Sequence, residues 1–417
     1  MTAASTTAKS PIPNSNKNPT RSITGLMSEF PPARERLVTL ANWRTQPSSD
    51  WSFHNVRRLL PTANIAAAKI PTPLDSAPHE LDSVAFEGVR GPTTLREALR
   101  TTNTKGFVVL RRGRIATEWY AQGMDATTPH IVFSVSKSIC GALGGVLAGK
   151  GLLDPDAPVT DYVPEVAGSV YGTGGCTVRH LLDMSVGISF IEDYVDPDGD
   201  VARYRRAVGW DIIKPGQSTM ALREFLAQQK PDGKTHGDAF HYVSTNTDLL
   251  GWVYERAAGR ALSDLLGDWL WTPLGAEADA YITLDAEGAM RAAGGICAAP
   301  RDLARFGEMI RRRGVAGGRQ VVPGTWIDDI NDNGDPQAWA RGDFAAMFPD
   351  SHYRSKFYQI DRKRRTLACI GIHGQWIYID PPSEVVVVRV AAEPMPLEVE
   401  NYRAWRRAFE AIVRHFS

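Results

Sequence analysis

The sequence of 417 residues has no excess charge of either sign and no long apolar run. Its 47 Lys and Arg residues balance its 47 Asp and Glu residues, so no bulk field favours nucleic acid or a membrane surface. The most apolar stretch, residues 139–149, is interrupted by glycines and flanked by lysines, and the polar first twenty residues hold no secretory apolar segment. We therefore expect a cytoplasmic protein that binds a small molecule. We expect it to bind neither nucleic acid nor a membrane. A homodimer stays open, and a periplasmic location would require a leader outside this sequence.

Motifs of several enzyme classes are also missing. No CxxC pair and no HExxH motif occurs, so we expect no metal site and no cofactor. Residues 172–175 are glycine-rich but lack the Lys-Ser/Thr of a phosphate-binding loop, and residues 184–187 lack the first glycine of the α/β-hydrolase elbow. The four cysteines are far apart and fit a reducing compartment: Cys140, Cys176, Cys297 and Cys369.

Hydrophobic periodicity predicts a mixed α/β (α+β) fold. Two apolar, β-branched runs around Arg111–Arg114 predict an antiparallel hairpin, and residues 370–380 and 384–392 predict a second hairpin across two prolines. Helical spacing follows Ser134, recurs between 177 and 271, and returns over 300–313. The last helix has an apolar face that includes Trp405 and Phe409, and we expect it to pack on the sheet rather than lie on a membrane.

These elements predict three regions of the chain. Residues 1–28 are polar and proline-rich and predict a flexible tail. Residues 29–133 and 275–417 predict an α/β domain with an antiparallel sheet, and residues 134–274 predict an inserted, mainly α subdomain.

The tetrapeptide Ser134-Val135-Ser136-Lys137 at a predicted helix start carries the strongest chemical signal. Residues three apart share a helical face, so the Lys137 amine can reach the Ser134 hydroxyl. Serine needs a base to become a nucleophile, and burial favours the neutral amine that can serve as one. The helix N-terminus adds partial positive charge where an oxyanion would form.

The triplet Tyr242-Val243-Ser244 is the second candidate. A tyrosine hydroxyl near the lysine could relay a proton to the leaving group, and Ser244 could hydrogen-bond the lysine or the substrate. The alternative is a buried tyrosine that precedes a helix capped by Ser244, Thr245 or Asn246.

In sequence order, SVSK, the segment Thr177–Ser189, the Tyr-x-Ser triplet and the segment Gly294–Gly314 resemble the serine β-lactamase and penicillin-binding-protein superfamily, on the side of the class C-like carboxylesterases. SVSKSICG, PVTDYVPEVAGSVY, EDYVDP and GIHGQWIYIDP more closely resemble the 6-aminohexanoate-dimer hydrolases. The resemblance implies a β-lactamase/DD-peptidase-like fold, an antiparallel sheet with flanking helices and an inserted α subdomain.

The same resemblance assigns roles to individual residues. It implies that Ser134 is the nucleophile, Lys137 its base and Tyr242 the proton donor, with the N–H groups of Ser134 and Ile372 as the oxyanion hole. The family's Lys-Thr-Gly or His-Thr-Gly place is held by residues 369–371, Cys-Ile-Gly, so we expect β-lactams to be poor substrates.

The resemblance also implies substrate contacts from Tyr194, which would hydrogen-bond the scissile amide nitrogen, and from Trp210, on a loop that would close over the site. Without it, each would be interpreted as an exposed loop aromatic. The acidic residues between 192 and 200 could attract a substrate ammonium, or could form a solvated loop, which we favour.

The expected function is a serine hydrolase that acts through an acyl-enzyme on small linear amides or esters. Two alternatives stay open: a carboxylesterase for short acyl esters without amidase activity, and a penicillin-binding-like sensor that is acylated and stalls.

Overall fold

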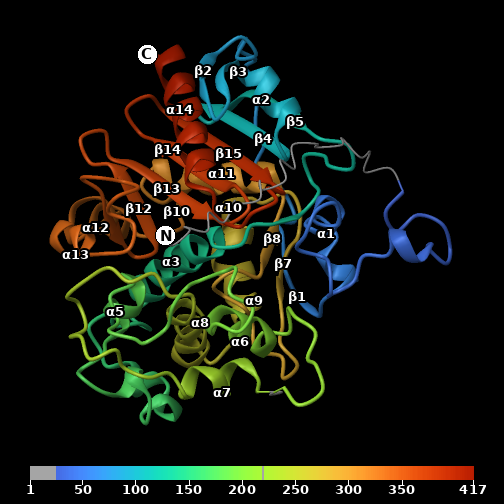
Figure 1. Cartoon of the computed structure of the whole chain (residues 1–417). Helices are drawn as coiled ribbons and strands as arrows, with labels where there is room; N and C mark the ends of the chain where they lie inside the picture. The colour runs from blue at the N-terminus through green and yellow to red at the C-terminus, as the bar shows by residue number, and fades with distance from the viewer. Residues whose placement is uncertain (1–24, 218–219) are drawn as a thin grey trace, which may run out of the picture.

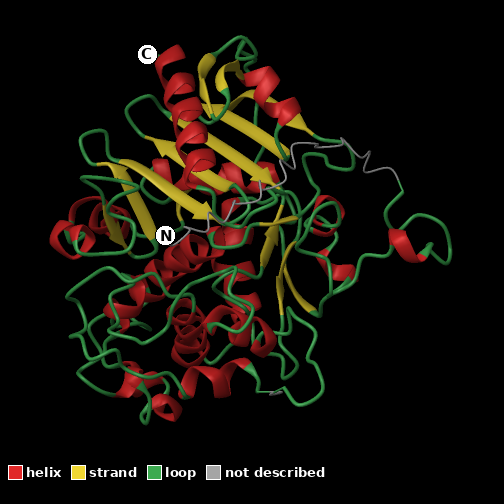
Figure 2. Ribbon diagram, in the orientation of Figure 1, coloured by secondary structure: helices red, strands yellow, loops and turns green. Residues whose placement is uncertain are grey.

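The computed structural model describes residues 25–217 and 220–417. A seven-stranded antiparallel sheet with strand order β11–β12–β13–β14–β15–β4–β5 fills the upper part of Figures 1 and 2. Its strands are β4 (Thr104–Arg111), β5 (Arg114–Tyr120), β11 (His352–Arg354), β12 (Phe357–Asp361), β13 (Thr366–Gly371), β14 (Gln375–Asp380) and β15 (Val385–Ala391). Both predicted hairpins are therefore confirmed, as β4–β5 and β14–β15.

One strand prediction was too long. Residues 370–380 were expected to form a single strand, but they contain the end of β13, a turn, and β14. The turn contains His373 and Gly374, whose φ angles of 60° and 87° lie in the left-handed region and break the extended backbone. Gly371, His373 and Gly374 are buried and Ile372 is half-buried, so the turn has no exposed polar stretch that the sequence pattern could reveal.

Helices bury both faces of the sheet. In β15, Val386 and Val388 belong to one apolar cluster and Val385 and Val387 to another, because successive strand residues point to opposite faces. The helix α11 (Pro300–Arg311) packs on β4, β14 and β15. The last helix, α14 (Val399–His415), contributes to the other cluster, so its predicted packing against the sheet is confirmed.

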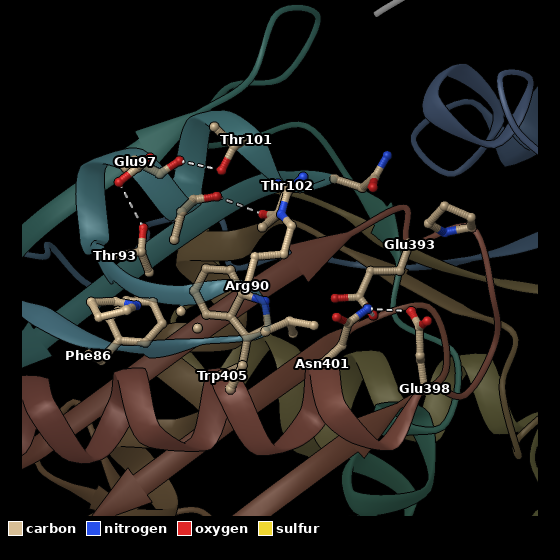
Figure 3. A pocket seen from close by; sticks show the side chains of 18 residues that line it. Phe86, Arg90, Thr93, Glu97, Thr101, Thr102, Glu393, Glu398, Asn401 and Trp405 are labelled. Carbon is tan, nitrogen blue, oxygen red and sulfur yellow. Dashed lines mark hydrogen bonds between the residues drawn. The ribbon is translucent and has the colours of Figure 1, made fainter. Parts of the chain in front are cut away.

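A short hairpin lies beside α14. It is formed by β2 (Ala85–Gly88) and β3 (Gly91–Thr94), and α2 (Leu95–Thr101) follows it. A cavity of about 510 Å³ lies between these elements and α14, with Phe86, Arg90 and Trp405 among its lining residues (Figure 3).

The part of the chain between Ser134 and Leu274 is helical, and none of its described residues lies in a strand. Its helices are α3 (Val135–Gly149), α4 (Val159–Tyr162), α5 (Val178–Leu182), α6 (Asp200–Ala207), α7 (Leu222–Ala227), α8 (Thr245–Ala258), α9 (Leu262–Leu266) and α10 (Thr272–Leu274), with a π-helical turn at Gly267–Trp271. The helix α3 lies between the main sheet and the other helices of this part of the chain (Figure 1). It contacts β13, β14 and α8.

Glycines allow this central position of α3. A Cβ on Gly141 would lie 2.2 Å from the carbonyl oxygen of Ser355, and one on Gly145 would lie 2.6 Å from the Trp326 ring. The glycines that interrupt the apolar run of the sequence therefore mark close packing around this helix.

A small sheet leads the chain into α3. It has four antiparallel strands in the order β1 (Thr62–Ile65), β7 (Ala280–Thr283), β8 (Ile296–Ala298) and β6 (His130–Ile131). The remaining short elements are α1 (Ser49–Ser52), β9 (Val315–Ala316), β10 (Arg319–Gln320), α12 (Gly324–Asp332), α13 (Pro336–Ala340) and the 3-10 turns Arg34–Arg36, Val56–Arg58, Pro164–Val166 and Val170–Gly172.

Most of the predicted tail, residues 1–24, lies outside the described residues. Residues 25–28 are described, and the Met27 N–H donates to the Arg36 carbonyl at 3.0 Å. Strands and helices lie in the parts of the chain where they were predicted. That these parts form an α/β domain and an α subdomain stays a prediction. Within the described ranges, no helix is both long and apolar enough to cross a membrane.

Candidate active site

Ser134 and Lys137 meet at the start of α3. The chain leaves β6, turns at Phe133, whose φ of 44° is unusual for a residue other than glycine, and enters the helix with Ser134 as its N-cap. The Lys137 Nζ lies 2.9 Å from the Ser134 Oγ and donates to the Ala293 carbonyl at 2.7 Å. The side chains are nearly enclosed, because Ser134 is 9% exposed and Lys137 is 2% exposed.

The surroundings of Lys137 favour a neutral amine. Burial lowers its pKa to about 8, and the Arg291 guanidinium acts in the same direction. The Glu192 and Asp248 carboxylates oppose this decrease. A pKa of about 8 leaves about 9% of the amine neutral at pH 7, roughly 300-fold more than the usual pKa of about 10.5 would.

Tyr242 lies in the same pocket as Ser134. Its backbone N–H donates to Asp343 at 2.8 Å, and its ring centroid lies 5.1 Å from the Lys137 Nζ. Burial, followed by the nearby Glu192 carboxylate, raises the pKa of the phenol, while the Ser134 hydroxyl opposes the increase. The group is therefore a protonated phenol at neutral pH, the form that a proton donor requires.

Ser244 is the N-cap residue of α8, but its side chain caps no backbone group of the helix. Both its N–H and its hydroxyl donate to the Glu192 carboxylate, and the Tyr194 hydroxyl donates to the same carboxylate at 2.9 Å. The Ser244 hydroxyl thus donates to Glu192 rather than to Lys137, and the substrate contacts expected of Ser244 and Tyr194 stay predictions. Tyr194 also lines the pocket of Ser134.

The acidic loop between 192 and 200 divides into two kinds of carboxylate. The Glu192 carboxylate accepts hydrogen bonds from Ser244 and Tyr194, as described above. Asp193 accepts from the Val195 N–H at 2.9 Å, and Asp196 accepts from the Asp198 N–H at 2.9 Å, so these carboxylates order their own loop. Whether the loop binds a substrate ammonium stays a prediction.

The end of β13 lies against the backbone of Ser134. A Cβ on Gly371 would lie 3.1 Å from the Ser134 nitrogen and 2.6 Å from the Val132 carbonyl oxygen, so only glycine permits this approach. The next residue, Ile372, lines the pocket together with Ser134, and its role in an oxyanion hole stays a prediction. Cys369 occupies the strand with a fully buried thiol, whose pKa burial raises to about 12.

Trp210 is buried and does not line the pocket of Ser134. Its side chain is 3% exposed, its Nε1 donates to the Thr283 Oγ1 at 3.2 Å, and the Arg291 guanidinium stacks on its ring at 4.4 Å from the centroid. It is not among the residues that line the pocket of Ser134. The alternative of an exposed loop aromatic is therefore wrong for Trp210, and its substrate contact and the closure of its loop over the site stay predictions.

Arg291 and Asp248 form a buried ion pair beside the lysine. The guanidinium donates to Asp248 at 3.0 Å, and the Ala293 N–H donates to the same carboxylate at 2.7 Å. The carbonyl of Ala293 in turn accepts from Lys137. Sequence motifs gave no signal for this pair, because its members are joined only by the fold.

The pocket wall is aromatic and aliphatic. Its members beyond the predicted site residues are Phe344, Met347, Phe348, Tyr358, Ile370, Gly371, Leu397 and Tyr402. An adjoining cavity of about 450 Å³ shares Tyr194, Tyr242, Phe344 and Leu397 with the pocket and adds the acidic side chains Glu192, Asp193 and Asp343. Among the described residues, no cluster of three or more His, Cys, Asp or Glu side chains is placed to hold a metal ion.

Comparisons with known proteins identify the family of the chain. The beta-lactamase family model matches residues 95–412. The chain is 37% identical over 369 residues to the 6-aminohexanoate-dimer hydrolase of Paenarthrobacter ureafaciens. The aligned residues cover 88% of this chain and 92% of that protein.

Solved structures show the same fold. A Bacillus anthracis protein assigned provisionally as a 6-aminohexanoate-dimer hydrolase superposes with a TM-score of 0.83 at 23% identity, over 92% of this chain and 98% of that one. A family VIII carboxylesterase superposes with a TM-score of 0.56 at 16% identity, over 82% and 99%. The chain thus belongs to the beta-lactamase family and is a relative of 6-aminohexanoate-dimer hydrolase.

Proposed function

We propose that this protein is a serine hydrolase that forms an acyl-enzyme on Ser134 and cleaves small linear esters and amides. The observation that carries the proposal is the 2.9 Å contact between the Ser134 Oγ and a buried Lys137 Nζ, inside a pocket that Tyr242 also lines. In this proposal Ser134 is the nucleophile, Lys137 the base and Tyr242 the acid for one bound carbonyl group.

The proposed reaction begins with neutral Lys137. Its amine takes the proton of the Ser134 hydroxyl as the oxygen attacks the carbonyl carbon, and the negative charge that forms on the carbonyl oxygen is held by the N–H groups of Ser134 and Ile372. Tyr242 then passes its proton to the leaving amine or alcohol and recovers one from the Lys137 ammonium, which restores the neutral base. Water hydrolyses the remaining ester, which releases the acid and frees the Ser134 hydroxyl.

No charged side chain of the described residues lines the pocket around Ser134. Its described members are aromatic, aliphatic or hydroxyl-bearing, and none carries a cation that would bind a substrate carboxylate. Esters need less help to expel the leaving group than amides, so short acyl esters are the broader expectation. The relative from Paenarthrobacter ureafaciens supports the narrower one, hydrolysis of linear 6-aminohexanoate oligomers.

The test is a panel of p-nitrophenyl esters and 6-aminohexanoate oligomers with the wild-type chain and Ser134→Ala. We expect turnover by the wild type, loss of nearly all activity in the variant, an unchanged melting temperature, and an acyl adduct on the Ser134 peptide in quenched samples. Retention of more than a few per cent of the rate by Ser134→Ala would contradict the proposal.

The same panel separates the alternatives. A burst of one equivalent of product without turnover would indicate an acylating sensor. Turnover of esters with no amide cleavage would indicate a carboxylesterase.

A further inference from the structure

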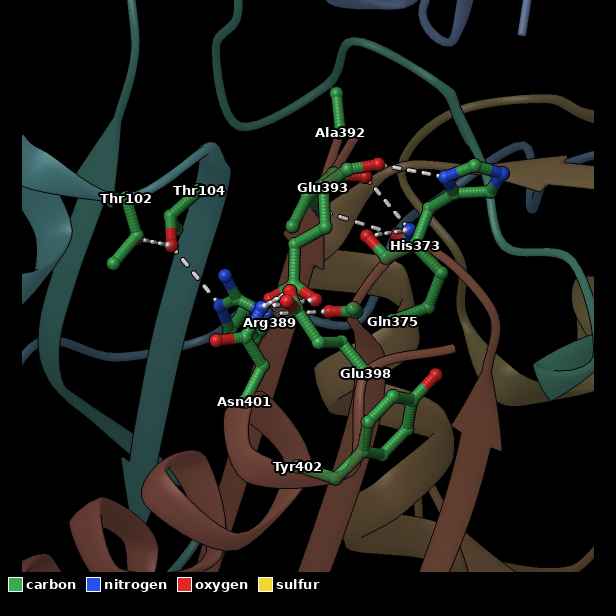
Figure 4. Close-up of polar contacts among 12 residues, drawn as sticks. Thr102, Thr104, His373, Gln375, Arg389, Ala392, Glu393, Glu398, Asn401 and Tyr402 are labelled. Carbon is green, nitrogen blue, oxygen red and sulfur yellow. Dashed lines mark hydrogen bonds and ion pairs between the residues drawn. The ribbon is translucent and has the colours of Figure 1, made fainter. Parts of the chain in front are cut away.

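The turn between β13 and β14, residues 372–374, is held by buried polar side chains from the C-terminal part of the chain (Figure 4). Gln375, at the start of β14, is 1% exposed. Its Nε2 donates to the carbonyls of Ile372 at 3.2 Å and His373 at 3.0 Å, and to that of Ala391 at 2.7 Å. Its Oε1 accepts from the Ala391 N–H at 3.0 Å, so one amide side chain joins the turn to β15.

Arg389 and Glu393 hold the far end of the turn. The Arg389 side chain is fully buried, and its Nη1 donates to the Gly374 carbonyl at 3.0 Å and to the Glu393 carboxylate at 2.7 Å. The backbone of Glu393 pairs with His373, because its N–H donates to the His373 carbonyl at 3.2 Å and its own carbonyl accepts from the His373 Nδ1 at 2.6 Å. The turn therefore cannot rotate without breaking a buried ion pair or its hydrogen bonds.

Tyr402, in α14, fixes the first peptide of the turn. Its hydroxyl donates to the Gly371 carbonyl at 3.0 Å. The carbonyl of Gly371 and the N–H of Ile372 belong to one planar trans peptide and point in opposite directions. A hydrogen bond that fixes the carbonyl thus also fixes the direction of the Ile372 N–H.

The four consecutive carbonyls of residues 371–374 all accept hydrogen bonds from side chains. The donors are Gln375 of β14, Arg389 of β15 and Tyr402 of α14. We propose that Gln375, Arg389 and Tyr402 are positioning residues, which hold the Gly371–Ile372 peptide so that its N–H points at the oxyanion. The inference rests on the proposed function, because it assumes that Ile372 stabilises a tetrahedral intermediate.

Positioning of this kind affects the transition state more than the bound substrate. Loss of an oxyanion-hole donor costs about 10²–10³-fold in kcat. A donor that is present but misaligned should cost part of that, so we expect Gln375→Met to lower kcat on a p-nitrophenyl ester by about 10- to 100-fold with little change in KM. The affinity for a boronic acid that forms a tetrahedral adduct on Ser134 should fall by the same factor.

Gln359 offers a matched control. It lies in β12 of the same sheet, is also 1% exposed, and donates to the Asn331 carbonyl at 3.0 Å. Gln359→Met removes an equally buried amide whose hydrogen bonds go to Asn331 and not to the turn. We expect it to lower the melting temperature while kcat and boronate affinity stay within about twofold of the wild type.

Tyr402→Phe keeps the ring and removes one hydroxyl, and it carries the test if Gln375→Met does not fold. We expect about a tenfold lower kcat with a parallel loss of boronate affinity. Unchanged kcat in a folded Gln375→Met or Tyr402→Phe, or a change confined to KM, would overturn the inference. Failure of the proposed function would be distinguishable, since the wild type would then show no turnover that depends on Ser134.

Discussion

The pH dependence of ester hydrolysis should report the ionisation of Lys137. Its pKa of about 8 in the folded chain means that the neutral base is lost as the pH falls through 8 and is fully present well above it. We expect kcat/KM for a p-nitrophenyl ester to rise about tenfold between pH 7 and pH 9 and then to level off. Spontaneous hydrolysis is subtracted with Ser134→Ala at each pH.

A substitution at Glu192 should shift this pH profile. Its carboxylate is the strongest influence that raises the Lys137 pKa against burial. Glu192→Gln keeps the shape of the side chain and removes the charge, so the rising limb should move to lower pH, and the fraction of the plateau rate reached at pH 7 should increase. The change also weakens the contacts to Ser244 and Tyr194, so the plateau itself should fall.

Asp193→Asn is the control for that displacement. Asp193 belongs to the same loop and loses the same charge, but its carboxylate accepts from the backbone of its own loop and is not among the largest influences on the Lys137 pKa. Its profile should coincide with that of the wild type. A rising limb near the usual lysine value of about 10.5, or equal displacement by both variants, would refute the assignment of Lys137 as a base tuned by burial and by Glu192.

Three further outcomes are expected. Tyr242→Phe should slow substrates with amine leaving groups by about 10²–10⁴-fold but nitrophenyl esters much less, because nitrophenolate leaves without a proton; equal losses with a lowered melting temperature would support a structural role. Nitrocefin should be turned over poorly, because the strand position at Cys369 supplies no cation; efficient turnover, measured by absorbance, would contradict this. Asp248→Ala should lower the free energy of unfolding by about 3–5 kcal/mol in urea titrations, because Arg291 would be left buried and unpaired, and Arg291→Met in the same chain should restore part of the loss.

Much of the active site was predictable because its signals are local. Ser134 and Lys137 are one helical turn apart, so their contact follows from helix geometry once the helix starts where it does. The hairpins and amphipathic helices likewise follow from side-chain periodicity over a few residues. The missing cation at residue 369 could be read directly because the motif that would hold it is continuous in the sequence.

Long-range contacts decided the rest. The acidic residues between 192 and 200 look equivalent in the sequence, yet only the fold turns Glu192 toward Ser244 while Asp193 caps its own loop. Trp210 looked like a loop aromatic, and the fold buries it against Arg291.

The sequence by itself determined that Ser134 and Lys137 lie one helical turn apart, and it determined the order of the sheet-forming and helical segments. Only the tertiary structure decided what surrounds them: the Ala293 carbonyl on the lysine, the aromatic wall, and the side chains that hold the turn at Ile372. The physical reason is that the pKa of a buried amine and the direction of a peptide N–H depend on groups that are distant in sequence, and chain folding alone brings those groups together.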